Sequence, residues 1–217
     1  MIEYKVEHDD INNTFIVYGP FAQGSFAVEI PNSDPNRKPF VDLFLHKADI
    51  DRGIQFLRCI SDDKTDALNE ALFIAGLNQC MKCFKYSKAR SSLKKHEVFK
   101  DSEELLVRFE KFEMMRDKHF DHDESGMLQA TASLLISPNE EEYFGGPPSV
   151  VWNRERLNYY DKGRSLQEVM RHTQYYLCRQ IDELSALMES AYAQCPKESL
   201  AAFKTAQLAL ALRNAKR

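Results

Sequence analysis

The sequence predicts a mainly α-helical domain with small β additions. Five segments carry apolar residues at helical spacing, whereas two short regions show the alternation or the β-branched residues typical of strands. Of the 217 residues, 43% are hydrophobic, which is enough to bury a sizeable core, and 8 are glycine and 8 proline. This composition excludes collagen-like and low-complexity proteins.

Residues 1–38 predict a β-type arm that packs on a helical body. The runs at 15–18 and 26–30 are rich in aromatic and β-branched residues, and glycine and proline separate them. Three prolines then close this region. We expect the rest, residues 39–217, to form a single helical domain with an insertion at about 125–160.

Helical periodicity predicts the first two helices of the body. Ile50, Ile54 and Leu57 repeat at helical spacing and indicate a helix over about 40–60. The segment 65–90 carries apolar residues on every face of the helical wheel, which is typical of a central helix. We therefore expect it to be the least exposed element.

Capping residues locate the later helices. A third helix is predicted from Ser102, or from the aspartate before it, to about Phe120. A fourth is predicted at about 164–193, where Ser165 and the glutamate three residues later match a capping box. A last amphipathic helix is expected at about 197–213.

Between the third and fourth helices, the pattern changes from helical spacing to alternation. Residues 128–136 alternate mostly with period two, which predicts a strand. Residues 149–152 follow a Gly-Gly-Pro-Pro turn and are a second candidate strand. The insertion is therefore expected to hold a short strand pair.

Charge and apolar patterning exclude two classes of protein. The formal net charge of -4 excludes a globally basic, histone-like nucleic-acid binder. The longest apolar stretch, 71–81, has about half of the roughly 20 residues that a membrane-spanning helix needs. The chain also begins without the basic and apolar segments of a signal peptide, so we expect a cytoplasmic protein with no membrane partner.

The five cysteines predict reduced thiols rather than a disulfide framework, because their number is odd and they lie mostly in apolar helical segments. Cys80 and Cys83 form a CxxC pair without a second pair, which favours packing in the core over zinc binding. His119, His122 and Asp123 alone are a weak metal pattern. We therefore expect neither a metal nor another cofactor.

An arginine stands on the apolar stripe of the third helix. At helical spacing, Phe109 and Phe112 share one face, and Arg116 falls at its centre. A buried guanidinium is costly unless it is paired, so Arg116 requires an acidic partner or an open cleft. A structural ion pair with Glu113, or with Glu168 of the fourth helix, is one interpretation.

The run from Met115 to Asp123 resembles the end of the signature helix in HEPN domains. That signature is an Arg, usually a polar residue next to it, and a His a few residues further on. Arg116, Asp117 and His122 fill these positions. The order of the helices is also similar to the HEPN layout, and the Arg-Asp-Lys start is similar to HEPN-like abortive-infection proteins. The resemblance covers roughly residues 40–193.

This resemblance implies an up-and-down helical bundle and a metal-independent ribonuclease that acts on single-stranded RNA, or a toxin-like defence protein with a protein antitoxin. In such an enzyme the RNA 2′-OH is the nucleophile. Arg116 would hold the phosphate, His122 would move a proton, and Asp117 would orient one of them. The family brings two such motifs face to face in a homodimer, which we expect here as well.

Basic and imidazole groups near the motif are the candidates for contacts with RNA phosphates. They are Lys118, His119, Arg154, Arg156 and Arg164. Without the resemblance, His119 is better interpreted as a packed or hydrogen-bonded histidine than as a base. The basic segment from Lys82 to Lys95 is expected at the start of the third helix, about 20 Å from Arg116 and too far to serve the same phosphate.

Two other interpretations stay open. His122 is surrounded by the acids Asp121, Asp123 and Glu124, which repel phosphate. These acids favour a non-catalytic HEPN-like module that binds nucleotide, RNA or a protein partner. The other interpretation is an unrelated structural protein of a phage or mobile element.

Overall fold

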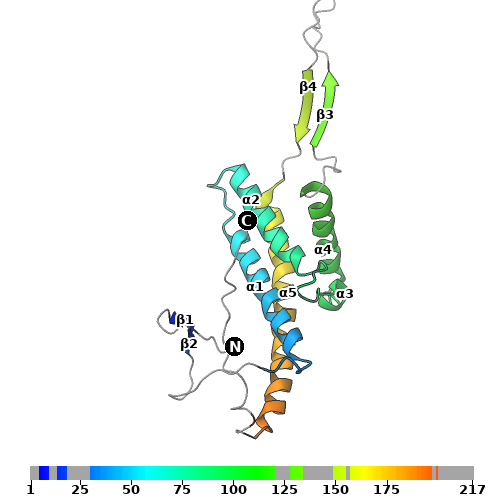
Figure 1. Ribbon diagram of the computed structural model, residues 1–217. Helices are drawn as coiled ribbons and strands as arrows, with labels where there is room; N and C mark the ends of the chain where they lie inside the picture. The colour runs from blue at the N-terminus through cyan, green and yellow to red at the C-terminus, as the bar shows by residue number, and fades with distance from the viewer. Residues whose placement is uncertain are drawn as a thin grey trace, which may run out of the picture. The chain divides into compact units, whose positions relative to one another are not determined.

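The described part of the chain is mainly helical, which confirms the predicted class (Figure 1). The computed structural model describes residues 5–9, 14–18, 30–120, 128–133, 149–154, 157–196 and 199. The helices are α1 (Arg37–Arg58), α2 (Asp66–Lys82), α3 (Lys95–Val98), α4 (Glu103–Met115), the π-helix η1 (Arg116–Phe120) and α5 (Tyr159–Ala193). In this part of the chain, no helix combines the length and the apolar character needed to cross a membrane.

The chain divides into two compact units. One unit comprises residues 42–181, and the other comprises residues 1–41 and 182–217. In the second of these, the Tyr192 hydroxyl near the end of α5 donates a hydrogen bond to Asp34. This bond raises the pKa of Tyr192 to about 12 and lowers the pKa of Asp34.

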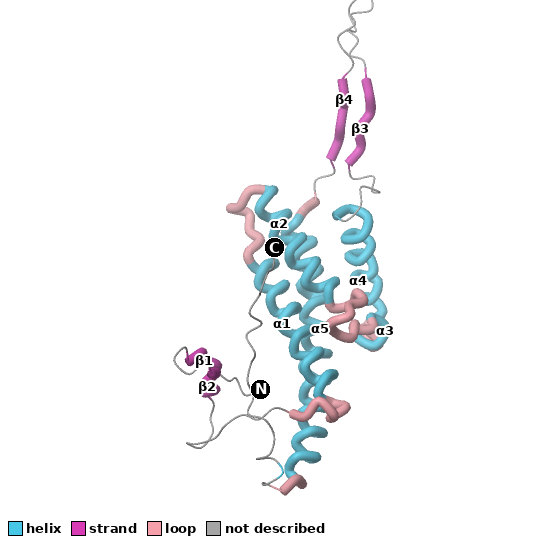
Figure 2. Tube along the Cα trace, in the orientation of Figure 1, coloured by secondary structure: helices cyan, strands magenta, loops and turns pink. Residues whose placement is uncertain are grey.

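The core of the 42–181 unit lies between α1, α2, α4 and α5, of which α1, α2 and α5 run side by side (Figures 1 and 2). Aromatic rings connect α2 to α4, because the ring centroids of Phe73 and Phe112 are 6.3 Å apart. Further along the chain, the ring of Phe84 lies 4.4 Å from that of Phe109, and the ring of Phe99 lies 5.2 Å from that of Phe109. The apolar stripe of α4 is therefore buried against the chain that leaves α2.

α1 and α2 come close together where Gly53 faces Gly76. A Cβ atom on Gly53 would lie 3.1 Å from the Gly76 carbonyl oxygen and would clash with Cε of Met170. A Cβ atom on Gly76 would lie 2.7 Å from Cγ of Leu57 and 3.2 Å from the Gly53 carbonyl oxygen. The two backbones come this close because neither residue carries a side chain.

The predicted end of the second helix is wrong. α2 ends at Lys82, and the backbone N–H of Cys83 bonds back to the carbonyls of Cys80 and Met81. The Cys83 carbonyl then accepts the Leu93 N–H at 2.8 Å, so a turn and a loop replace the expected last two turns of helix. Not every apolar residue of α2 enters the core either, because Leu68 in its first turn is 47% exposed.

The third and fourth helices differ in how well their starts were predicted. Ser102 caps α4, since its hydroxyl oxygen accepts the Leu105 N–H at 3.4 Å, which confirms one of the two expected caps. The capping box at Ser165 is wrong, because Ser165 lies inside α5. Asn158 caps that helix instead and accepts the Asp161 N–H at 3.1 Å. The one-turn helix α3 was not predicted from the sequence.

Two antiparallel hairpins complete the described elements. β1 (Lys5–Asp9) pairs with β2 (Thr14–Tyr18), and β3 (Leu128–Ser133) pairs with β4 (Ser149–Arg154). The β-type run at 26–30 lies outside the described residues apart from Ile30. The helix expected at 197–213 lies outside them apart from Ser199.

Candidate functional site

Arg116 stands where the apolar stripe of α4 meets a π-helical turn. Phe109 and Phe112 are buried on this stripe, and the Arg116 side chain keeps 26% of its surface exposed. The Arg116 N–H bonds to the carbonyls of Phe112 and Glu113, and η1 begins at this residue. Because a π turn spaces side chains differently from an α turn, helical counting no longer holds beyond Met115. Such turns often occur at functional sites.

One carboxylate binds two cations beside this turn. Nη1 of Arg116 donates to Oδ1 of Asp117 at 2.9 Å, and Nζ of Lys85 donates to Oδ2 of the same carboxylate at 2.8 Å. We call Lys85, Asp117 and Arg116 the Asp117 cluster. The hydrogen bond from Lys85 lowers the pKa of Asp117 most, partial burial opposes this, and Arg116 lowers it further. Asp117 is therefore ionised at neutral pH.

The position of Lys85 corrects the expected separation of the basic segment from Arg116. The ring of Phe84 packs 4.4 Å from Phe109, which lies in the middle of α4 rather than at its start. From Phe109 to Asp117 the helix rises only about 12 Å, a gap that the long Lys85 side chain closes together with the carboxylate. Lys85 and Arg116 consequently contact the same group.

The acids considered as structural partners of Arg116 bind other cations. Glu113 accepts a hydrogen bond from Lys95 at 3.0 Å, and Glu168 forms an ion pair with Arg108. The structure places Asp117, the next residue along the chain, in contact with Arg116.

The remaining predicted site residues are described only in part. His122 and Arg156 lie outside the described residues, and the side chains of His119 and Arg154 are not described. Lys118 is exposed on η1, and Arg164 is exposed on α5 with its guanidinium carbon 5.2 Å from the centre of the Tyr160 ring. Of the expected site, the structure thus brings together Arg116 and Asp117.

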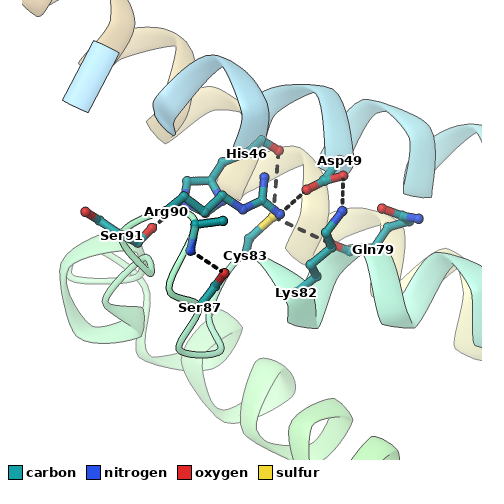
Figure 3. A network of polar contacts seen from close by, with 9 residues as sticks. His46, Asp49, Gln79, Lys82, Cys83, Ser87, Arg90 and Ser91 are labelled. Carbon is teal, nitrogen blue, oxygen red and sulfur yellow. Dashed lines mark hydrogen bonds and ion pairs between the residues drawn. The ribbon is translucent and has the colours of Figure 1, made fainter. Parts of the chain in front are cut away.

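A buried polar network between α1 and the loop after α2 was missed by the sequence analysis (Figure 3). His46, 2% exposed, bonds through Nε2 to the Ser91 carbonyl at 2.7 Å, so Nε2 is the protonated nitrogen that donates. Asp42 accepts the N–H of the same Ser91 at 2.9 Å. Asp49 forms ion pairs with the buried Arg90 and, at 3.0 Å, with a lysine at the end of α2. The loop is thereby held against α1.

Burial shifts the pKa of the histidine in this network and of the two thiols beside it. It lowers the pKa of His46, and the nearby Arg90 lowers it further, although the bond to Ser91 opposes both effects. The described residues provide no hydrogen-bond partner for Nδ1 of His46. Burial also raises the pKa of Cys83 to about 12 and that of Cys80 well above its ordinary value, so neither thiol is an activated nucleophile.

A signal for this network was present in the sequence. Asp42, His46 and Asp49 follow one another at helical spacing, on the side of α1 that also carries Ile50 and Leu57. Arg116 attracts attention because it is a charged residue on an apolar helical stripe. By the same criterion, Asp42, His46 and Asp49 on the first helix are candidates for buried polar contacts. The network has the features of a structural anchor, because its charged groups pair within it.

All five cysteines are free, and Cys80 and Cys83 pack in the core as expected. Among the described residues, no group of three or more His, Cys, Asp or Glu side chains is arranged to hold a metal ion. Comparison of the chain with protein-family models, curated proteins and solved structures gives no match.

Proposed function

We propose that this chain is a HEPN-like, metal-independent ribonuclease or toxin-like defence protein that acts on single-stranded RNA in the cytoplasm. The helical bundle would carry the two hairpins as additions to the HEPN-like layout. The observation that carries the proposal is Arg116, a half-buried arginine on the apolar stripe of α4, at a π turn and within reach of solvent. An arginine in this position can bind an anion that approaches from outside.

The chemistry needs a charge to hold the phosphate and a group to move a proton. The RNA 2′-OH would attack the adjacent phosphorus, forming a 2′,3′-cyclic phosphate and releasing the 5′-oxygen of the next nucleotide. Arg116 would bind the non-bridging oxygens and stabilise their charge in the transition state. His122 would take the proton of the 2′-OH or protonate the leaving oxygen. Before RNA binds, Asp117 would orient Arg116 through the 2.9 Å contact.

The proposal includes a homodimer. A two-fold axis places the same segment of each protomer opposite itself, so the end of α4 would face its copy and the two motifs would form one cleft. A toxin of this kind would also have a protein antitoxin as its partner. Light scattering at tens of micromolar protein tests the dimer, and a strictly monomeric species contradicts it.

The test of the enzyme is incubation of the purified protein with single-stranded RNA in EDTA. We expect cleavage that yields cyclic phosphate ends, that persists without divalent metal, and that is lost in Arg116→Ala and in His122→Ala. Lys111→Met is the control, because Lys111 is an exposed cation on α4 outside the motif. Absence of cleavage by the wild type, or equal cleavage by His122→Ala, refutes the enzyme.

A non-catalytic HEPN-like module is the second candidate. The acids Asp121, Asp123 and Glu124 favour it, because their charge around His122 repels phosphate. In that case calorimetry would detect binding of a nucleotide, while no RNA would be cleaved. Cell toxicity that depends on His122 would exclude this candidate.

A further inference from the structure

We propose that the Asp117 cluster is a binding site for an RNA phosphodiester, in which the Asp117 carboxylate is the resting occupant and Lys85 is a second phosphate ligand beside Arg116. This inference rests on the proposed function. It adds Lys85, which lies outside the motif, as a phosphate ligand, and it explains why an acid, Asp117, stands next to Arg116 in the motif. In the RNA-free protein each oxygen of Asp117 accepts one cation, at 2.8 Å from Lys85 and 2.9 Å from Arg116.

The geometry of this contact suits a phosphate. A carboxylate and a phosphodiester both present two oxygens that share a negative charge, and arginine and lysine bind either group. The two cations already lie on two different oxygens of one anion. An incoming phosphodiester would accept the same two donors on its two non-bridging oxygens while Asp117 turns away.

Asp49 on α1 is another carboxylate that binds two cations, and the Asp117 cluster differs from it in exposure. The side chains of Lys85, Asp117 and Arg116 keep 40%, 39% and 26% of their surface exposed. In the network of Figure 3, the Lys82 side chain keeps 56% of its surface exposed, but Asp49 and Arg90 keep only 14% and 9%, so the Arg90–Asp49 ion pair is closed to a ligand. Ion pairs near the surface contribute little free energy, and a ligand can therefore replace Asp117 at low cost.

The backbone of Lys85 is fixed before any ligand arrives. Phe84 packs on Phe109, and the Cys83 carbonyl is bonded to the Leu93 N–H. The Lys85 N–H itself bonds to the Met81 carbonyl at 3.1 Å. A ligand that binds here does not have to order the backbone of Lys85, which favours affinity.

The test measures binding of a fluorescent 2′-O-methyl RNA 12-mer by anisotropy at several salt concentrations. This probe has no free 2′-OH, so binding is measured without cleavage. We expect Lys85→Met to bind about tenfold more weakly and to lower the salt slope by about 0.7, the value of one phosphate contact on a single strand. Lys85→Arg should retain binding, and Lys111→Met should bind like the wild type.

Asp117→Asn gives the sharper result. If the carboxylate competes with phosphate, its removal should tighten binding about two- to fivefold, the range that corresponds to a surface ion pair. Asp101→Asn removes an exposed acid at the opposite end of α4 and controls for the change in net charge. Weaker binding by Asp117→Asn would show that Asp117 supports the site instead of competing for it, and would overturn the inference.

The remaining outcomes separate this inference from the proposed function. An enzyme that cleaves RNA through His122 while Lys85→Met binds like the wild type would overturn the inference and leave the function standing. Binding that depends on Lys85 and tightens in Asp117→Asn, without any cleavage by the wild type, would support the inference and refute the ribonuclease. A wild type that does not bind the 12-mer would overturn the inference. Circular dichroism and thermal melts confirm that each variant is folded.

Discussion

Replacing Gly76 by alanine should destabilise the protein, although the same change stabilises most helices. In an ordinary helix interior, Gly→Ala raises stability by about 1 kcal/mol, because alanine loses less backbone entropy on folding. At Gly76 the new Cβ would lie 2.7 Å from Cγ of Leu57 and 3.2 Å from the Gly53 carbonyl oxygen. Leu57 is 2% exposed, so it has little room to move.

The magnitude follows from two opposing contributions. Overpacking a well-packed site costs about 1–3 kcal/mol, and the helix propensity of alanine offsets about 1 kcal/mol of it. We therefore expect a net loss of about 1 kcal/mol in the free energy of unfolding. A domain of this size would then melt about 2–4 °C lower.

Gly163→Ala is the matched control in α5. Its Cβ would meet Cδ1 of Ile60 at 3.0 Å, the mobile end of a flexible side chain, so the propensity gain should prevail and stability should rise or stay unchanged. Urea unfolding followed by circular dichroism measures both variants. If Gly76→Ala is as stable as Gly163→Ala, then α1 and α2 do not approach each other at Gly53 and Gly76, and the reasoning fails.

Three further predictions concern the core, the caps and the buried histidine. Leu77 is fully buried, so Leu77→Asp should abolish cooperative unfolding, because an unpaired buried charge costs several kcal/mol against a total of about 5–15. Ser102→Ala should cost about 1 kcal/mol in urea unfolding, whereas Ser165→Ala should be nearly neutral, since Ser102 caps α4 and Ser165 lies inside α5. The pKa of His46 is lower in the folded protein than its ordinary value of 6.5, so below that pH the unfolded chain binds more protons. Stability should therefore be full above about pH 6.5 and fall as the pH drops towards the folded pKa. His46→Gln, which can still donate to Ser91 but does not titrate, should flatten this part of the profile measured by thermal melts, and an unchanged slope would contradict the role of His46.

The sequence predicted those features that depend on local periodicity. α1 begins and ends close to the expected residues, and α4 begins at its expected cap, because the apolar stripes and the Ser102 cap are properties of the segments themselves. The end of α2 depends instead on a bond between the Cys83 carbonyl and the Leu93 N–H, ten residues further along the chain. No pattern within the segment 65–90 reveals that bond.

In the candidate site, too, the residues of one segment were predictable from the sequence, whereas contacts between segments were not. The position of Arg116 on the stripe of α4 came from helical spacing, and its neighbour Asp117 came from the motif. The contact of Lys85 with Asp117 depends on the packing of Phe84 against Phe109, which only the folded chain shows. The π turn at Arg116 is a shift in backbone hydrogen bonding by one residue, and side-chain periodicity does not report it.

Because α1 bonds the backbone of Ser91, these contacts to the loop after α2 do not depend on the side chains of the loop. Asp42 and His46 stand one helical turn apart and bond the N–H and the C=O of one residue, as a neighbouring strand would. Both contacts involve main-chain atoms, so any residue except proline, which has no N–H, preserves them. Substitutions elsewhere in the loop can therefore change its surface charge while the position of its backbone is kept. The surface chemistry of such a loop can change without refolding the helices that carry it.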